Sequence, residues 1–440
     1  MTRPAIGIVG GGILGLTAAY RLAQAGARPV VYERSQDLGG LVGSFDFDGH
    51  PADRFYHVIL PTDDRVIGLA TELGLGERFR FRPVGVGFYD DGRLFSMNSL
   101  REFLTFPLLP FHDRLRLGAF VARCQMKTTY EDLDEIVLED WLRRLCGKRM
   151  VERLWRPLLD SKFDGRFGDL PATYLWARTR RMSKTRDSAG REVMGWLEGG
   201  YQALIDRLER AVVDLGGEVY AGTAVERIVG GRGGVSGIVV DGALRPFDQA
   251  LCTLAPPQAR RLLDDELVDA VGEDHCRYLG VICVLLRTRR SVSPYYTLNI
   301  TDRRVPLTTV VETTHVVDPE YAGGSLLYAA KYVDPSHPDL DAPPDELEER
   351  YLGHVRTMFP DLVDEEILAT RVQRARVVEP VHLLGGARRL PDLVPVPGLA
   401  LASTAHVYPE TVNGQAVIGV ADRVVSALLD SLPTETRHAA

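Results

Sequence analysis

The sequence has few lysines and lacks any cysteine spacing that would indicate a metal site or a redox pair. Only five of its 52 basic residues are lysine. The cysteines are scattered without Cys-x-x-Cys spacing, at Cys124, Cys146, Cys252, Cys276 and Cys283. We therefore predict no metal site. Buried, reduced thiols in a cytoplasmic protein are the expected state of these cysteines.

A strong excess of one charge and long apolar runs are also absent. The formal net charge is −8, from 52 basic and 60 acidic residues, so nothing electrostatic favours nucleic acid or an anionic membrane as a partner. No uncharged apolar run reaches the roughly 18–20 residues that a membrane span needs. The first residues lead directly into an apolar strand, so no signal peptide and no stable membrane insertion are expected.

The first forty residues carry the clearest motif. Residues 5–9 (AIGIV) predict a buried strand that runs into the sequence Gly10-Gly11-Gly12-Ile13-Leu14-Gly15, which is G-x-G-x-x-G. A helix is predicted from there to residue 25, and a second strand over 29–32 ends at Glu33, 18 residues beyond the last glycine of the motif. In such a βαβ unit the glycines allow a tight turn, close approach of a pyrophosphate and close helix packing. The start of the helix offers N–H groups to the phosphates.

The acid after the second strand narrows the choice of nucleotide. The carboxylate of Glu33 can accept a hydrogen bond from a ribose 2′-hydroxyl and would repel a 2′-phosphate, which disfavours NADP. A tight turn without a ligand would also use glycines, but here the strand, glycines, helix and acid all have the required spacing. The unit alone does not decide between FAD and NAD. No second G-x-G-x-x-G is found, which disfavours a reductase with two dinucleotide sites.

The residues after this unit resemble the superfamily of FAD-dependent amine oxidases, protoporphyrinogen oxidases and phytoene desaturases, with UDP-galactopyranose mutase as a more distant member. Arg34 and the doublet Gly39-Gly40 follow the acid, as they do in that superfamily. The resemblance implies that the glycine motif binds the ADP half of FAD. Leu41 departs from the pattern, since relatives carry Arg or Lys there. One phosphate or flavin contact is therefore expected to differ.

Two later stretches share the resemblance. Relatives place the segment around Val225 under the adenine. Near the C-terminus, a strand at 399–402 leads to a helix predicted over 412–429, whose N-terminus relatives direct at the N1/O2 edge of the flavin. Relatives carry an acid after that strand, where this chain has Ser403 and Thr404, so the hydrogen bonds on the pyrophosphate side are expected to differ. The residues that the resemblance implies in FAD binding are Gly10, Gly12, Ile13, Leu14, Gly15, Glu33, Arg34, Gly39, Gly40, Leu41, Val42, Tyr56, His57, Val225, Ser403, Thr404, Thr411, Val412 and Asn413.

The expected fold is α/β, in two interleaved domains, since 440 residues exceed one ordinary domain. The resemblance implies a Rossmann-type FAD-binding domain of the glutathione-reductase-like superfamily, made of residues 1–95, 195–257 and 391–440. The rest forms a mixed α+β substrate domain. Residues 96–194 have helical spacing, which predicts a cap with helices over 100–104, 114–123, 138–145 and 149–159. Residues 258–390 alternate like strands.

Candidate catalytic residues come from three places. His57 matches a histidine of the mutases and could move a proton near neutrality; a role in packing is equally open. His406 and Tyr408 flank the predicted flavin edge. Tyr296 and Lys331 lie in the strand-rich stretch 258–390, and amine oxidases use paired aromatics and a lysine near flavin N5. Packing is the simpler role for each of these others taken singly. The candidates are His57, Tyr408, His406, Lys331 and Tyr296, with Lys162 as the alternative lysine.

The sequence therefore predicts an FAD-dependent oxidoreductase that oxidises a small organic molecule at a C–N, C–O or C–C bond by hydride transfer to flavin N5. A role in biosynthetic or secondary metabolism is expected, with dioxygen or another acceptor reoxidising the flavin. One alternative is an isomerase similar to UDP-galactopyranose mutase that acts on a nucleotide-sugar, because His57 matches. A second is a non-catalytic flavin-binding protein. A homodimer is left open.

Overall fold

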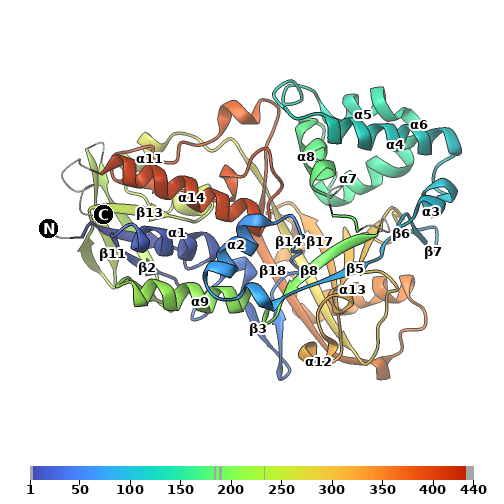
Figure 1. Cartoon of the computed structure of the whole chain (residues 1–440), viewed down its shortest axis with the longest axis horizontal. Coiled ribbons are helices and arrows are strands. Elements are labelled where there is room, and N and C mark those ends of the chain that lie inside the picture. Colours follow the sequence, from blue (N-terminus) through green and yellow to red (C-terminus); the bar gives the residue numbers. More distant parts are fainter. Residues whose placement is uncertain (1–2, 183–184, 188–190, 232, 433–440) are drawn as a thin grey trace.

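Five parallel strands form the sheet that holds the glycine motif. The computed structural model describes residues 3–182, 185–187, 191–231 and 233–432. The strand order is β19-β13-β1-β2-β9, so segments that are far apart in the sequence lie side by side (Figure 1). The strands are β1 (Ala5–Val9), β2 (Arg28–Tyr32), β9 (Glu218–Tyr220), β13 (Gln249–Cys252) and β19 (Leu399–Leu401). The predicted strands at 5–9 and 29–32 are confirmed, the second with one more residue.

Each face of this sheet has its own apolar cover. Side chains such as Ile6 and Ile8 pack against three helices on one face, whereas Val9 and Val30 pack against a small antiparallel sheet on the other. The helices are α1 (Ile13–Gln24), α9 (Gly200–Asp214) and α14 (Gly414–Ser431), and the small sheet contains β10 (Val225–Gly231), β11 (Gly234–Val240) and β12 (Ala243–Pro246). The predicted C-terminal helix is confirmed, although it starts two residues later than expected because Asn413 caps it.

A seven-stranded sheet, mostly antiparallel, forms the second half, in the order β18-β14-β17-β16-β15-β6-β7. Its strands are β6 (Val86–Asp90), β7 (Arg93–Ser96), β14 (Arg277–Thr288), β15 (Thr297–Ile300), β16 (Thr309–Glu312), β17 (Ser325–Val333) and β18 (Ile367–Val381). Helix α13 (Pro344–Met358) covers one face. Two features differ from expectation: β6 and β7 belong to this sheet although residues up to 95 were assigned to the FAD-binding domain, and the stretch 258–390 includes the long helix α13.

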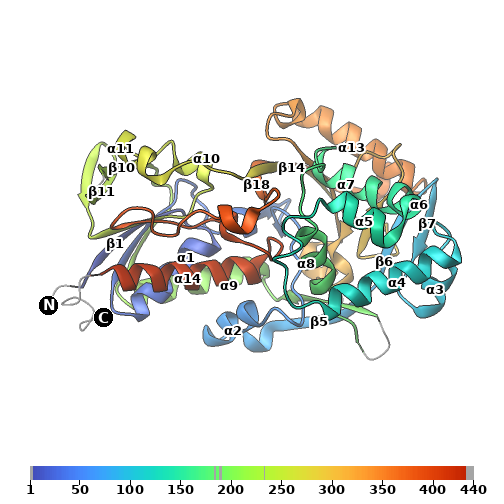
Figure 2. The same ribbon diagram turned by 90° about the horizontal axis from the view of Figure 1, so that it is seen from above.

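Helices with their own apolar core form a cap over the second sheet, at the end of the molecule opposite β10 and β11 (Figure 2). They are α3 (Leu100–Thr105), α4 (Phe111–Met126), α5 (Leu138–Cys146), α6 (Lys148–Met150), α7 (Arg156–Phe163) and α8 (Thr173–Met182). The predicted helices over 100–104, 114–123 and 138–145 are confirmed. The helix predicted over 149–159 contains a π-helical segment, Val151–Trp155.

The remaining elements are short. They are β3 (Ser44–Phe47), β4 (His50–Asp53), β5 (Phe79–Val84), β8 (Glu192–Leu197), α2 (Asp64–Glu72), α10 (Pro256–Ala259), α11 (Asp265–Val271) and α12 (Pro319–Ala322). Within the described ranges, no helix is long and apolar enough to cross a membrane, and no three His, Cys, Asp or Glu side chains gather as a metal site. All five cysteines are free, and only Cys276 is not fully buried.

Candidate functional site

The loop after β1 leaves room for a ligand beside Gly12. A Cβ atom at Gly12 would meet only the carbonyl oxygen of Gly39, at 3.8 Å, and a Cβ at Gly40 would meet only the Gly12 Cα, at 3.5 Å. Gly15 is different, because its Cβ would collide with the carbonyl oxygen of Gly10. Packing of the protein therefore requires glycine at position 15. At Gly12 the absent side chain leaves a glycine cradle, formed by Gly12, Gly39 and Gly40, that fits a pyrophosphate.

The acid at the end of β2 lies directly against this loop. The carboxylate of Glu33 accepts hydrogen bonds from the backbone N–H groups of Gly11, at 2.8 Å, and of Ser35, at 2.9 Å. The N–H of Thr223 donates to the carbonyl oxygen of Glu33 at 2.7 Å, which brings the start of β10 at Val225 beside the acid. The structure thus gathers the residues predicted for the ribose and the adenine.

The other residues predicted around the nucleotide differ in exposure. Ile13, Leu14 and Val42 are buried and can offer only backbone groups. Arg34 is exposed, and Leu41 keeps 37% of its surface. Leu41 has an apolar side chain, so the prediction stays that the basic contact expected of relatives at this position is missing here.

Asn413 caps the start of α14. The side chain of Asn413 accepts a hydrogen bond from the Ala416 N–H at 3.0 Å and donates one to the Thr411 carbonyl at 2.5 Å. Gly414 packs against the hydroxyl of Tyr201, where a Cβ would lie 2.5 Å from that oxygen. Free N–H groups of the first turn and the positive end of the helix dipole are therefore presented beside Tyr201.

His57 continues this line of contacts. Its ring lies edge-on to that of Tyr201, with 5.6 Å between the centroids, and its Nδ1–H donates to the carbonyl oxygen of Phe55 at 2.8 Å. Burial lowers the pKa of His57 to about 4. The ring is therefore neutral at pH 7, with a free lone pair on Nε2. This corrects the expectation that His57 titrates near neutrality.

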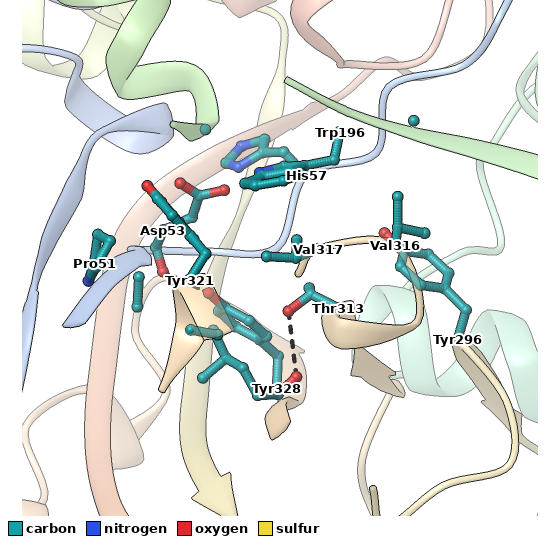
Figure 3. A pocket seen from close by; sticks show the side chains of 15 residues that line it. Pro51, Asp53, His57, Trp196, Tyr296, Thr313, Val316, Val317, Tyr321 and Tyr328 are labelled. Atoms are coloured by element: carbon teal, nitrogen blue, oxygen red, sulfur yellow. Dashed lines mark hydrogen bonds between the residues drawn. The ribbon is translucent and has the colours of Figure 1, made fainter. Parts of the chain in front are cut away.

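A small cavity lies behind the segment that carries His57 (Figure 3). It has space of about 30 Å³ for water, and Asp53, His57, Trp196 and Tyr296 are among the residues that line it. Among the described residues, none donates a hydrogen bond to the Asp53 carboxylate, and none forms an ion pair with it. Burial raises the pKa of Asp53 to about 7. Among the predicted catalytic residues, His57 and Tyr296 meet at this cavity.

A second group of side chains, which we name the tyrosine chamber, lies where the cap meets the seven-stranded sheet. Each of its members keeps part of its surface exposed; they are Tyr56, Tyr174, Tyr332, Lys162, Arg178 and Glu379. Lys162 of α7 pairs with Glu379 of β18, and its ammonium lies 3.2 Å from the centre of the Tyr332 ring. The hydroxyls of Tyr56 and Tyr332 lie close enough that each affects the pKa of the other. Because Tyr56 precedes His57, one short segment connects the chamber with the start of α14.

Three of the predicted catalytic residues are placed otherwise. Lys331 lies on the face of β17 that packs against α13, opposite the face of Tyr332, so its predicted role at the flavin is wrong. His406 is buried, and its Nδ1 accepts from the Ser403 N–H at 3.1 Å, which makes it part of a local cap. The hydroxyl of Tyr408 donates to the carboxylate of Asp134 in the cap. Neither of these two groups is free to meet a substrate.

Sequence reasoning missed three residues of the chamber, Tyr174, Arg178 and Glu379. Arg178 stands in a segment with several arginines, which is typical of a solvated helix face, and nothing local distinguishes it. A signal was available for the lysine. Successive side chains of a strand point to opposite faces, so Lys331 and Tyr332 could not both enter the same site.

Comparison with known proteins adds the family. A model of the family "Flavin containing amine oxidoreductase" matches residues 14–424. Coproporphyrinogen III oxidase of Mycobacterium leprae is 31% identical over 235 residues, which cover 48% of this chain and 51% of the relative. This chain thus spans about half the length of the curated relatives that it matches.

Two solved structures share the fold over nearly the whole length. One is assigned as a protoporphyrinogen oxidase of Exiguobacterium sp. 255-15, with a TM-score of 0.74 and 21% identity, and covers 97% of this chain and 99% of that one. Cyclohexylamine oxidase of Brevibacterium oxydans has a TM-score of 0.69 and 18% identity, with coverage of 97% and 99%. FAD is the cofactor for which the glycine cradle and Glu33 are suited. The chain belongs to the family of flavin containing amine oxidoreductases.

Proposed function

We propose that this chain is an FAD-dependent oxidoreductase that oxidises a small organic molecule held in the tyrosine chamber. The observation that supports this best is the continuous line of contacts from the start of α14 through Tyr201 and His57 to Tyr56. It joins the part of the fold suited to a flavin with the partly exposed side chains of the tyrosine chamber beneath the cap. When bound, FAD accepts two electrons from the substrate, as a hydride at N5.

The start of α14 has an electrostatic task in this proposal. Its free N–H groups and helix dipole favour negative charge beside residues 411–413. His57 is neutral, so it adds no positive charge that would need a counter-ion. The protein therefore offers a fixed, preorganised environment for an anionic ring at this edge.

The tyrosine chamber has the task of orienting the substrate and excluding water. Burial raises the pKa of Tyr56 to about 12, and the pKa of Tyr332 is raised well above its usual value, also by burial. These hydroxyls stay protonated at pH 7 and can donate hydrogen bonds, but they do not act as bases. Among the residues placed here, Asp53 is the group that can take up or release a proton near neutral pH, at the cavity that it shares with His57.

The relatives support oxidation in biosynthesis. The Mycobacterium leprae protein is named for the oxidation of coproporphyrinogen III, and a Synechococcus elongatus relative, 26% identical over 155 residues, for the desaturation of phytoene. We extend to this chain the reaction class alone, with dioxygen or another acceptor, in the cytoplasm. The family match favours this reaction over a mutase-type isomerisation.

An assay of oxygen consumption and peroxide formation tests the proposal. The purified protein, supplied with FAD, is given amines, polyols and partly saturated ring compounds in separate reactions. We expect one class of compound to be oxidised with consumption of an acceptor. Turnover of a nucleotide-sugar without net oxidation, and only after chemical reduction of the flavin, would contradict it.

A further inference from the structure

Tyr408 connects two parts of the molecule that the proposed function assigns to different tasks. It lies in the segment 403–413, between β19 and the start of α14, and its hydroxyl donates a hydrogen bond to the carboxylate of Asp134. Asp134 is a buried residue of the cap, in the loop before α5. A hydrogen bond therefore joins the cap to the segment that leads to the predicted flavin edge.

Backbone groups hold Asp134 in place from its other side. Its carboxylate also accepts from the Ala387 N–H at 3.1 Å, and its carbonyl oxygen accepts from the Gly385 N–H at 3.0 Å. Its own N–H donates to the carbonyl oxygen of Tyr130 at 3.1 Å. A displacement of Tyr408 would therefore either break the hydrogen bond to Asp134 or move the cap loop with it.

Aromatic contacts extend this link into the cap. The ring of Tyr130 lies edge-on to that of Tyr408, with 5.7 Å between the centroids, and the ring of His382, just after β18, lies 4.8 Å away. Tyr130 also packs against Trp176 of α8, with 6.1 Å between the centroids. Aromatic pairs at these separations favour particular mutual orientations. The orientation of Tyr408 is thus connected with α8 through two rings.

The segment of Tyr408 is bonded equally well to the FAD-binding half. Arg423 of α14 donates to the carbonyl oxygen of His406 at 2.8 Å, two residues before Tyr408. Asn413, at the other end of the segment, caps the same helix. A ligand that binds at the start of α14 therefore restricts the segment that carries Tyr408.

We propose that Tyr408 and Asp134 are positioning residues that couple the cofactor site to the cap, so that a flavin bound at the start of α14 also orders the cap loop 128–138. Ordering one end of a bonded segment lowers the entropic cost of ordering the other end. The coupling is reciprocal, so an ordered cap also strengthens the binding of the flavin. The inference rests on the proposed function for its cofactor alone and does not depend on which compound is oxidised.

Hydrogen exchange read by mass spectrometry, with and without bound FAD, tests the coupling. In the unaltered protein we expect FAD to slow the exchange of backbone amides in residues 128–138 by at least about fivefold. In Tyr408→Phe, which keeps the ring and loses the hydroxyl, FAD should slow this exchange by less than about twofold. Equal slowing in both proteins, or no slowing in the unaltered protein, would overturn the proposal.

Two further variants separate coupling from a loss of structure. Tyr89→Phe is the matched control, because it removes a hydroxyl that donates to the Thr357 carbonyl oxygen at 3.2 Å in the second half of the fold. It should respond to FAD as the unaltered protein does. Asp134→Asn keeps an acceptor for Tyr408 and should give an intermediate response. A purely structural defect in Tyr408→Phe would speed exchange equally with and without FAD, and the effect of FAD would then survive, against the proposal.

The reciprocal effect is measured as the dissociation constant of FAD. Tyr408→Phe should bind FAD about three- to tenfold more weakly than the unaltered protein, which corresponds to the loss of one hydrogen bond. An equal loss in Tyr89→Phe would contradict the role of Tyr408. Thermal unfolding of each variant without FAD shows that the comparison is made between folded proteins.

The outcomes keep this inference apart from the proposed function. A protein that binds FAD and orders its cap, but oxidises no compound, would contradict the proposed function and retain the coupling. An FAD-loaded oxidase whose cap exchanges equally with and without FAD would do the reverse. A protein that takes up no FAD would contradict both.

Discussion

The guanidinium of Arg181 donates two hydrogen bonds to the buried carboxylate of Asp63, at 2.6 and 3.0 Å. Arg181 lies near the end of the cap helix α8, and Asp63 stands just before α2, where it also accepts from the Leu60 N–H at 2.8 Å. This ion pair fixes the helix that carries Arg178 against the segment that follows His57. The geometry of the tyrosine chamber therefore depends on a bond outside it.

Arg181→Met is expected to destabilise the protein, because it leaves a carboxylate that is 1% exposed without its counter-charge. The expected loss in the free energy of unfolding is about 3 kcal/mol. Denaturant unfolding measures it. Arg180→Met on the same helix is the control, with an expected change of less than about 1 kcal/mol. Equal losses in the two variants would contradict a special role for this ion pair.

The glycines of the cradle should separate cofactor binding from folding. Gly12→Val places a side chain where the structure leaves open space, so we expect a folded protein that no longer retains FAD. Gly15→Ala should instead lower stability, since its Cβ collides with backbone. Visible absorbance and thermal unfolding of both variants give the comparison. A Gly12→Val protein with full yellow colour would refute the assignment of the cradle.

Asp53 should make the stability of the protein depend on pH. Its pKa is raised by burial from 3.8 to about 7, so between these values the folded state holds more protons than the unfolded state. Stability is then highest below pH 4 as far as this group is concerned, and falls as the pH rises toward 7.

Asp53→Asn removes this dependence. We expect the variant to gain stability over the unaltered protein as the pH rises from 4 to 7, by on the order of 2–4 kcal/mol in the free energy of unfolding. Unfolding by denaturant at several pH values measures the difference. His57→Gln should shift the difference in the opposite direction, because the pKa of His57 is lowered from 6.5 to about 4 and the native histidine therefore contributes stability that grows as the pH rises between these values. If the difference in free energy of unfolding between Asp53→Asn and the unaltered protein did not change with pH, the raised pKa of Asp53 would be contradicted.

The nucleotide half of the fold was predictable from the sequence because its determinants are local. The strand, glycine motif, helix and acid up to Glu33 occupy consecutive residues, and each element has its own signal. The second strand pairs with β1 in the register that the motif requires. The start of α14 was predicted to within two residues. The sequence analysis did not identify Asn413 as the cap, which makes the helix begin at Gly414.

The tyrosine chamber was not predictable in the same way, because residues from five distant segments form it. The chamber forms only when the cap lies on the second sheet, which brings together Tyr56, Lys162, Arg178 and Glu379. No local sequence pattern predicts this contact between cap and sheet. The role of Lys331 was assigned wrongly for a simpler reason. The face of β17 that meets the chamber is set by packing against α13, and Lys331 belongs to the covered face.

The visible absorbance spectrum of the purified protein, recorded before and after anaerobic mixing with candidate substrates, tests the central claim most directly. We predict the bands of an oxidised flavin, and their loss on addition of one class of compound without any other reductant. A colourless protein that does not take up added FAD would contradict the cofactor. Flavin bands that no compound removes, together with turnover of a nucleotide-sugar only after dithionite, would contradict the oxidation.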